Sequence, residues 1–85
     1  MRRAAKVDAN HREVIATLRR LGWRVADTHA LPGFVDLIAF HPAHGVRMVE
    51  VKAPKGEYTR AQMRLMGDGW PVATVRSIED AINLR

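Results

Sequence analysis

The sequence predicts a single α/β domain in which a mixed sheet is flanked by helices, with the element order α-β-β-β-α-β-α. Helix-period segments and strand-like segments alternate along the chain, and links that contain glycine or proline separate them. With 85 residues the chain has room for one small core, so residues 1–85 are expected to form one domain. A mixed sheet with helices on its faces is the natural packing for this order.

The first helix is expected to begin at about Asp8 or Asn10 and to end at Leu21. Apolar residues recur there with the 3.6-residue period of a helix, and Gly22 follows as a helix-terminating residue. Asn10 and Glu13 have the spacing of a capping box, which would make Glu13 an ordinary surface acid of the helix. A catalytic role for Glu13 is the alternative to this capping role.

Three strands are expected after this helix. They cover residues 23–27, 34–40 and 48–52, where β-branched and other apolar residues predominate, and a loop over residues 28–33 separates the first two. The link at residues 41–45 contains proline and glycine and is short enough for a β-hairpin. The second and third strands should therefore pair as antiparallel neighbours.

The C-terminal part of the chain is expected to contain a helix, a strand and a final short helix. Thr59 begins the first of these helices, with Gln62 at capping-box spacing, and glycines close it. Residues 72–75 form the last strand. Ser77 is the N-cap of the final helix, which ends near Leu84.

The charge balance indicates a polyanionic partner. Fourteen Lys and Arg residues against nine Asp and Glu residues give a net charge of +5, and most of the cations are arginine, which suits forked contacts with phosphate. A solubilising surface is the alternative reading of this charge. Residues 1–6 form a basic lead that we expect to be flexible. Cysteine is absent, which excludes disulfides, and no apolar run reaches membrane-spanning length.

Each strand of the expected hairpin carries an acid that a buried strand does not favour. Asp36 lies in the first apolar run and Glu50 in the second, where an ionised carboxylate is costly to bury unless it is paired or coordinates a cation. Glu50 and Lys52 are two residues apart, so they point to the same face of their strand. Antiparallel pairing would bring Asp36 close to both. An ordinary ion pair on a solvated face is the alternative.

Two carboxylates and one ammonium on a patch of sheet suit metal-dependent hydrolysis of phosphodiester bonds. Asp36 and Glu50 would hold Mg²⁺ or Mn²⁺, with the backbone carbonyl of Val51 in reach, because hard divalent cations take oxygen ligands. Lys52 would orient or help to deprotonate the attacking water, or stabilise the developing oxyanion. The carboxylates would repel each other without a cation.

Several other residues are candidates for contacts with nucleic acid. They lie in the loop before the second strand, in the turn after Lys52 and on the second helix: His29, Lys55, Tyr58 and Arg60. A histidine in a loop is more often merely solvated. The pair His41 and His44 in the hairpin turn lacks further ligands at suitable spacing for a metal site.

The ordered set of motifs resembles the PD-(D/E)XK nuclease superfamily, and within it the VRR-NUC family of small viral, phage and bacterial nucleases. The likeness rests on Gly33-Phe34-Val35-Asp36-Leu37-Ile38-Ala39, Glu50-Val51-Lys52, Lys55-Gly56 and Thr59-x-x-Gln62. The segment Arg12–Val25 also resembles the first helix and strand of archaeal Holliday junction resolvases. Val35 departs from the proline that is frequent in the family, and Thr59 stands where serine is common.

The resemblance implies a restriction-endonuclease-like core and a metal-dependent DNA endonuclease that is selective for a branched structure such as a Holliday junction or a flap. It carries metal coordination onto Asp36, Glu50 and Glu13, catalysis onto Lys52, and an assisting role onto Gln62. It also implies a homodimer in the cytoplasm of a bacterium or a phage-infected cell. A non-catalytic DNA-binding module and a nuclease subunit that needs a partner protein remain the alternatives.

Overall fold

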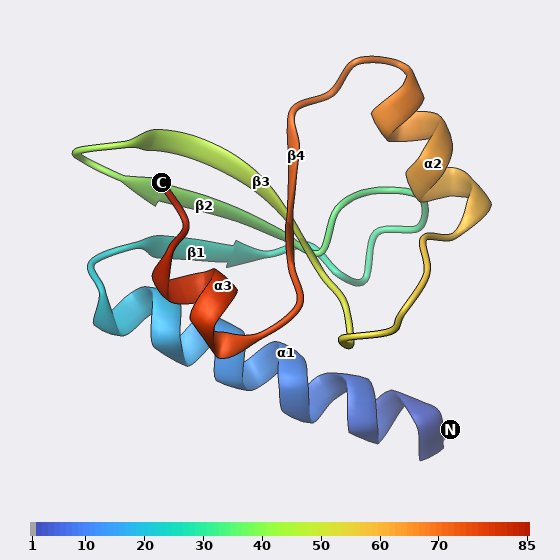
Figure 1. Ribbon diagram of the computed structural model, residues 1–85, viewed down its shortest axis with the longest axis horizontal. Helices are drawn as coiled ribbons and strands as arrows, with labels where there is room; N and C mark the ends of the chain where they lie inside the picture. The colour runs from blue at the N-terminus through green and yellow to red at the C-terminus, as the bar shows by residue number, and fades with distance from the viewer. Residues whose placement is uncertain (1) are drawn as a thin grey trace.

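The structure, a computed structural model, describes the backbone of residues 2–85 and the side chains of residues 10–85. The helices and strands follow the predicted order α-β-β-β-α-β-α (Figure 1). Their bounds are α1 (Arg2–Arg20), β1 (Arg24–Asp27), β2 (Leu37–His41), β3 (Gly45–Val51), α2 (Arg60–Gly67), β4 (Val72–Val75) and α3 (Ile78–Ile82). The α/β class is therefore confirmed.

The strands form one mixed sheet in the order β1-β2-β3-β4. β1 pairs antiparallel with β2, and β2 pairs antiparallel with β3, so the expected hairpin is confirmed. β3 and β4 run parallel, because the segment that contains α2 crosses from one to the other. The register aligns Leu37 with Val49, and Glu50 with Thr74.

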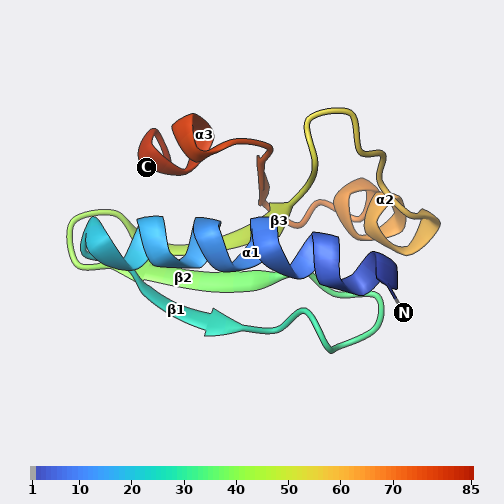
Figure 2. The ribbon, with the colours of Figure 1, turned by 90° about the horizontal axis from the view of Figure 1, so that it is seen from below.

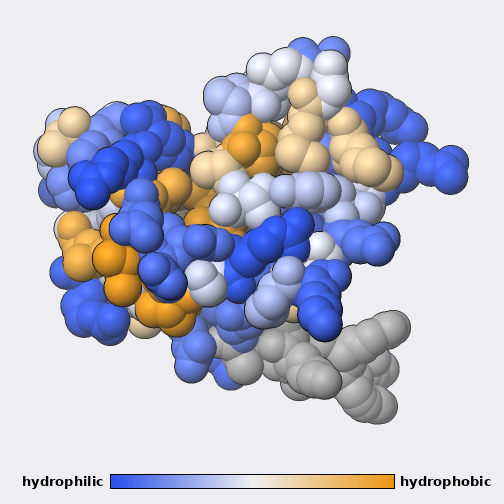
Figure 3. Space-filling model, in the orientation of Figure 1, coloured by the Kyte–Doolittle hydropathy of each residue, from blue (hydrophilic) through white to orange (hydrophobic). Residues whose placement is uncertain are grey.

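One face of the sheet carries the hydrophobic core. Alternate strand residues point to this face, as the two-residue period requires, and α1 and α3 cover it (Figures 1 and 2). The core cluster consists of Val14, Ile15, Leu18, Trp23, Leu37, Ala39, Val49, Val51, Val75 and Ala81. Figure 3 shows hydrophilic residues over much of the visible surface, with hydrophobic residues gathered around β4 and beside α3.

The first helix is longer than predicted. α1 begins at Arg2, so the expected start at Asp8 or Asn10 is wrong, and Asn10 lies inside the helix where it cannot form the capping box with Glu13. The basic lead at residues 1–6 falls mostly within this helix, and its side chains lie outside the described residues. The glycine end is confirmed, because Gly22 has a φ of 97° and reverses the chain toward β1.

The two later helices have the predicted caps. The Thr59 side chain accepts a hydrogen bond from the Gln62 backbone N–H, and the Gln62 side chain accepts one from the Thr59 N–H, which completes the capping box of α2. The Ser77 hydroxyl accepts from the Asp80 N–H at 3.1 Å and caps α3. The first cap fixes the turn of α2 that carries Gln62.

No helix within residues 2–85 is both long and apolar enough to cross a membrane.

Candidate active site

Asp36 lies beside the C-terminal end of β3. The sequence predicted that it would be part of the second strand, but in the structure it precedes that strand. β2 begins only at Leu37, and the Oδ2 of Asp36 accepts a hydrogen bond of 2.9 Å from the Val51 backbone N–H. The Asp36 carbonyl accepts from the Thr28 N–H at 2.8 Å. These two bonds position Asp36 beside Glu50 and Lys52, so the expected proximity of the three groups is confirmed.

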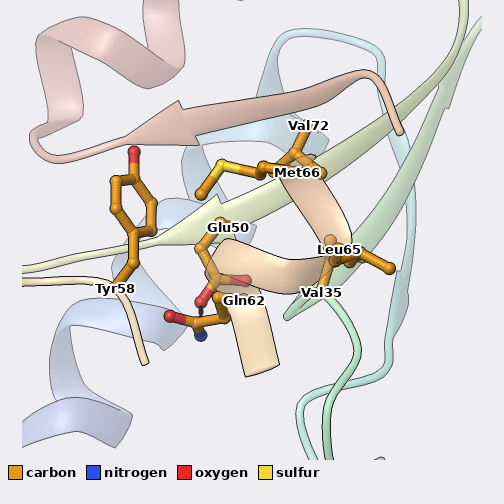
Figure 4. A pocket seen from close by; sticks show the side chains of 7 residues that line it. All are labelled: Val35, Glu50, Tyr58, Gln62, Leu65, Met66 and Val72. Atoms are coloured by element: carbon orange, nitrogen blue, oxygen red, sulfur yellow. Dashed lines mark hydrogen bonds between the residues drawn. The ribbon is translucent and has the colours of Figure 1, made fainter. Parts of the chain in front are cut away.

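Glu50 is a carboxylate with 1% of its surface exposed. Its Oε2 accepts a hydrogen bond from the Gln62 side-chain amide (Figure 4). The same oxygen lies 3.5 Å from the Lys52 Nζ. Its Oε1 is buried and has no hydrogen-bond partner among the residues that the structure describes. An orphaned carboxylate oxygen is costly in a buried position, so the environment of Glu50 suits an additional positive ligand.

The pKa of Glu50 also reflects the burial of this carboxylate. Burial and, second, the negative charge of Asp36 raise the pKa from its ordinary 4.5 to about 7, although Lys52 acts in the opposite direction. Asp36 is therefore close enough for its negative charge to oppose the ionisation of Glu50. A cation bound between them would remove this repulsion.

The three groups line a cavity of about 790 Å³. Its lining comes from α1, the residue before β2, the end of β3, the loop that follows and α2: Asn10, Asp36, Glu50, Val51, Lys52, Ala53, Pro54, Gly56, Glu57 and Gln62. Five residues that the sequence proposed for catalysis or metal binding thus meet at one cavity: Asp36, Glu50, Val51, Lys52 and Gln62. Their convergence depends on the β3 end and on the capped first turn of α2.

Glu13 is the predicted catalytic residue that the structure does not bring to this cavity. It is exposed on α1 and is absent from the lining, whereas Asn10, three residues earlier on the helix, contributes to it. Glu57 also lines the cavity and was missed, because an acid in an irregular loop has no periodic pattern that would mark it. Asn10 was read as a cap, which hid its position on the helix face.

A second residue that the sequence did not indicate organises the cavity wall. The Arg76 Nη1 donates to the carbonyl of Gly56 at 2.7 Å and to that of Ala53 at 3.1 Å. The guanidinium carbon also lies 5.6 Å from the centroid of the Tyr58 ring. Arg76 therefore ties the loop after Lys52 to the end of β4. No local spacing could reveal a contact made across 20 residues.

The four residues predicted to contact nucleic acid differ in their exposure and in their position relative to the cavity. Lys55 is exposed between the cavity-lining residues Pro54 and Gly56, and Arg60 is exposed as the first residue of α2, so both are accessible to a polyanion. Tyr58 is half-buried, with a hydrogen bond of 2.5 Å between its hydroxyl and that of Thr74, and its ring lies 5.7 Å from the Lys52 Nζ. His29 lies outside the cavity lining, with its Nδ1 2.8 Å from Asp27.

α2 contributes to the site through a second, smaller pocket. Figure 4 shows Gln62 reaching toward Glu50, with Leu65 and Met66 from the same helix lining the pocket together with Val72. α2 also lies against the loop before β2, since a Cβ placed at Gly33 would be 3.8 Å from the Cβ of Ala61. Apolar packing of α2 thus holds the Gln62 amide at the buried carboxylate.

The donor atoms fit a hard divalent cation. Asp36, Glu50 and Glu57 bring three carboxylates to the lining of the cavity, to which Val51 also contributes, and carboxylate and carbonyl oxygens are the ligands that Mg²⁺ and Mn²⁺ prefer. The unpartnered Oε1 of Glu50 is the specific feature that such an ion would satisfy.

No protein-family model, curated protein or solved structure matches this chain in the three comparisons.

Proposed function

We propose that this chain is a Mg²⁺- or Mn²⁺-dependent endonuclease that hydrolyses phosphodiester bonds in DNA. The observation that carries the proposal is the buried Glu50 carboxylate, whose Oε1 has no partner, beside Asp36 and Lys52 at a cavity. Paired acids with an adjacent lysine suit metal-dependent hydrolysis of a phosphodiester. The motif resemblance to PD-(D/E)XK nucleases supports the same assignment.

Asp36 and Glu50 would hold the ion, and a bound divalent cation supplies charge for the phosphoryl transition state and orders the attacking water. The Val51 N–H positions the Asp36 carboxylate, which leaves that carboxylate directed at the end of β3. The Gln62 amide occupies Oε2 of Glu50, so Oε1 is the atom that remains for coordination. Gln62 is thus a positioning residue in this scheme.

Lys52 is the group suited to the reacting water or the developing negative charge. Its Nζ lies 3.5 Å from Glu50 Oε2, and its side chain has 13% of its surface exposed, so it faces the cavity rather than bulk solvent. An ammonium held at this distance can orient a water by hydrogen bonding and can stabilise an oxyanion. Loss of Lys52 should therefore impair the chemical step more than the binding of DNA.

DNA is the proposed substrate because the chain is basic, and because Lys55 and Arg60 are exposed in the two segments, the loop after Lys52 and α2, that contribute to the cavity lining. The resemblance to branched-DNA resolvases leads us to propose further a homodimer that acts on Holliday junctions or flaps in the cytoplasm of a bacterium or phage-infected cell. A two-fold symmetric dimer would present two such sites to a two-fold junction.

Cleavage of labelled DNA by wild type and Lys52→Ala tests the proposal. The panel contains single strand, duplex, flap, splayed arm and four-way junction, each with Mg²⁺, with Mn²⁺ or with EDTA. We expect metal-dependent cleavage by wild type and a loss on the order of 100-fold or more in Lys52→Ala, as is usual for removal of an acid–base or electrostatic group. Arg20→Ala, which removes one exposed cation at the far end of α1, is the matched control and should retain activity.

The pattern of products separates the remaining possibilities. Paired symmetric cuts in the junction would support a dimeric resolvase, whereas cuts in the flap alone would favour a monomeric action. Equal cleavage by wild type and Lys52→Ala would refute the assignment. Salt-sensitive binding to DNA without any cut would indicate a DNA-binding module, and activity that arises only with an added protein would indicate a partner-dependent subunit.

A further inference from the structure

His11, Asp27 and His29 form a compact cluster outside the lining of the candidate active site. The Asp27 Oδ1 lies 3.0 Å from the His11 Nε2 and 2.8 Å from the His29 Nδ1. The two imidazole rings lie close to each other, with their centroids 4.9 Å apart. The three possible ligand atoms all fall within 4.8 Å of one another, which is the spacing of groups that can share one ion.

Three separate parts of the chain build this cluster. His11 lies on α1 and is 4% exposed, although it is a polar residue on the core side of the helix. Asp27 is the last residue of β1, and its carboxylate accepts a hydrogen bond of 3.1 Å from the backbone N–H of His29. This short turn folds the His29 ring back toward the helix. The strand end thus presents an acid and an imidazole to the imidazole on α1.

We propose that His11, Asp27 and His29 form a metal site that takes Zn²⁺. Zinc binds imidazole nitrogen and carboxylate oxygen at about 2.0–2.2 Å, so neighbouring ligands of a tetrahedral ion stand roughly 3.3 Å apart. The two contacts of Asp27 Oδ1, at 3.0 and 2.8 Å, are slightly shorter than this spacing, and the three possible ligand atoms all lie within 4.8 Å of one another, so small side-chain rotations would bring them to the distances that the ion requires. Asp27 and His29 are exposed, which leaves the fourth position to water.

The ligand types separate this site from the active-site cavity. Two imidazoles and one carboxylate favour a borderline ion such as Zn²⁺, whereas the carboxylates and backbone oxygens around Glu50 favour Mg²⁺ or Mn²⁺. Without an ion, the same geometry requires each histidine to direct an N–H at Asp27. A zinc ion would take the place of those two N–H groups: each neutral imidazole would carry its proton on the other ring nitrogen, and the charge of the ion would offset that of the carboxylate.

Zinc at this position would connect α1 to the loop that runs from β1 to Asp36. That loop is already closed by hydrogen bonds from Thr28, whose backbone N–H donates to the Asp36 carbonyl and whose hydroxyl donates to the Val35 carbonyl at 2.7 Å. The ion therefore acts as a structural clamp on the segment that leads to Asp36. Zinc binding at this site does not depend on the chain being a nuclease.

Isothermal titration of the full chain with ZnCl₂, in excess Mg²⁺ to occupy the oxygen-lined cavity, tests the proposal. We expect one Zn²⁺ bound per chain at micromolar concentration, with loss of saturable binding in His29→Ala and weaker binding in Asp27→Asn. Both residues are exposed, so the variants should fold, which circular dichroism checks. His44→Ala, which removes a histidine outside the cluster, should bind Zn²⁺ as wild type does.

Nitrogen-15 NMR of the imidazole rings gives an independent readout. Zinc should shift the signals of His11 at Nε2 and of His29 at Nδ1, and leave those of His41 and His44 in place. The proposal is overturned if no saturable zinc binding occurs, if His29→Ala and Asp27→Asn both bind as wild type does, or if the ion shifts only the other two histidines. In these cases the three residues form a hydrogen-bonded cluster alone.

Discussion

Among the single residues, Glu50 has the environment least like that of an ordinary surface acid. The sequence identified it because it interrupts an apolar run, and burial of an unpaired carboxylate is costly. Spacing also placed Lys52 on the same face. What the sequence could not predict is that the two oxygens differ, with Gln62 on Oε2 and no partner on Oε1, since this depends on how α2 packs.

The variant Glu50→Gln should stabilise the metal-free protein at alkaline pH. Burial and Asp36 raise the pKa of Glu50 to about 7, so the ionised form lowers the stability of the folded state above that pH. As the pH falls from 7 toward the ordinary pKa of 4.5, protonation of Glu50 removes this cost in wild type. The side-chain amide in Glu50→Gln is neutral at every pH, so the variant does not have this cost of burying a charge.

Urea unfolding in EDTA at pH 8 and at pH 5 measures this difference. We expect Glu50→Gln to be more stable than wild type by roughly 1–3 kcal/mol at pH 8, with the gain mostly lost at pH 5. The difference in unfolding free energy between wild type and Glu50→Gln is taken at each pH, so the contribution of other titrating groups cancels. A variant that is less stable than wild type at pH 8 would mean that the ionised Glu50 is already well compensated by Lys52 and Gln62.

The cluster of His11, Asp27 and His29 shows a different limit of sequence reasoning. His11 fits the core-facing helical period, and His29 looks like a solvated loop residue, so each has an ordinary explanation. Their meeting point is Asp27, which is 16 residues from His11 in the sequence. Only the packing of α1 on the sheet brings them together.

At the scale of elements, caps predicted helix positions better than periodicity predicted helix starts. Thr59 and Ser77 are the observed N-caps, and the strand at residues 72–75 has the expected bounds. α1 extends beyond Asp8 because asparagine and aspartate inside a helix cost only about 0.7 kcal/mol or less each relative to alanine. A cap-like residue therefore permits a helix start without requiring one.

The loop at residues 53–57 is the element on which the cavity most depends, and Arg76→Lys tests how it is held. A lysine keeps the charge but loses the planar guanidinium, whose Nη1 donates to the carbonyls of both Ala53 and Gly56, so we expect faster amide exchange at Gly56, whose N–H donates to the Ala53 carbonyl at 2.9 Å. The loss of these bonds should cost roughly 1–2 kcal/mol in unfolding free energy.

Hydrogen exchange followed by mass spectrometry over residues 53–57 measures the effect of Arg76→Lys. Arg64→Lys, an exposed change on α2, is the control and should leave exchange in the loop unaltered. Faster exchange in the loop with unchanged protection in β2 and β3 is the expected pattern. Unchanged exchange at Gly56 would show that the loop is held by other contacts, such as those of Tyr58.

At the scale of the whole molecule, the order of elements and the pairing of the hairpin followed from the sequence, because apolar periods and turn residues specify them locally. The cavity could not be predicted from the sequence, because its lining combines residues of α1, the end of β3, a loop and α2. The choice between Asn10 and Glu13 depends on how α1 lies across the sheet, which helical periodicity leaves undetermined. The net charge of +5 acts at this scale too, since in the proposed function it would attract polyanionic DNA to the whole molecule.

Cation binding at Asp36 and Glu50 is the central claim, and Mn²⁺ titration followed by electron paramagnetic resonance tests it without any assumption about the DNA substrate. Manganese accepts the same oxygen ligands as Mg²⁺ and loses its free-ion signal when bound. Wild type and His29→Ala should each bind Mn²⁺ at the oxygen-lined cavity, and Asp36→Asn/Glu50→Gln should lose that binding. Equal Mn²⁺ binding by this double variant, or none by wild type at millimolar concentration, would contradict the claim.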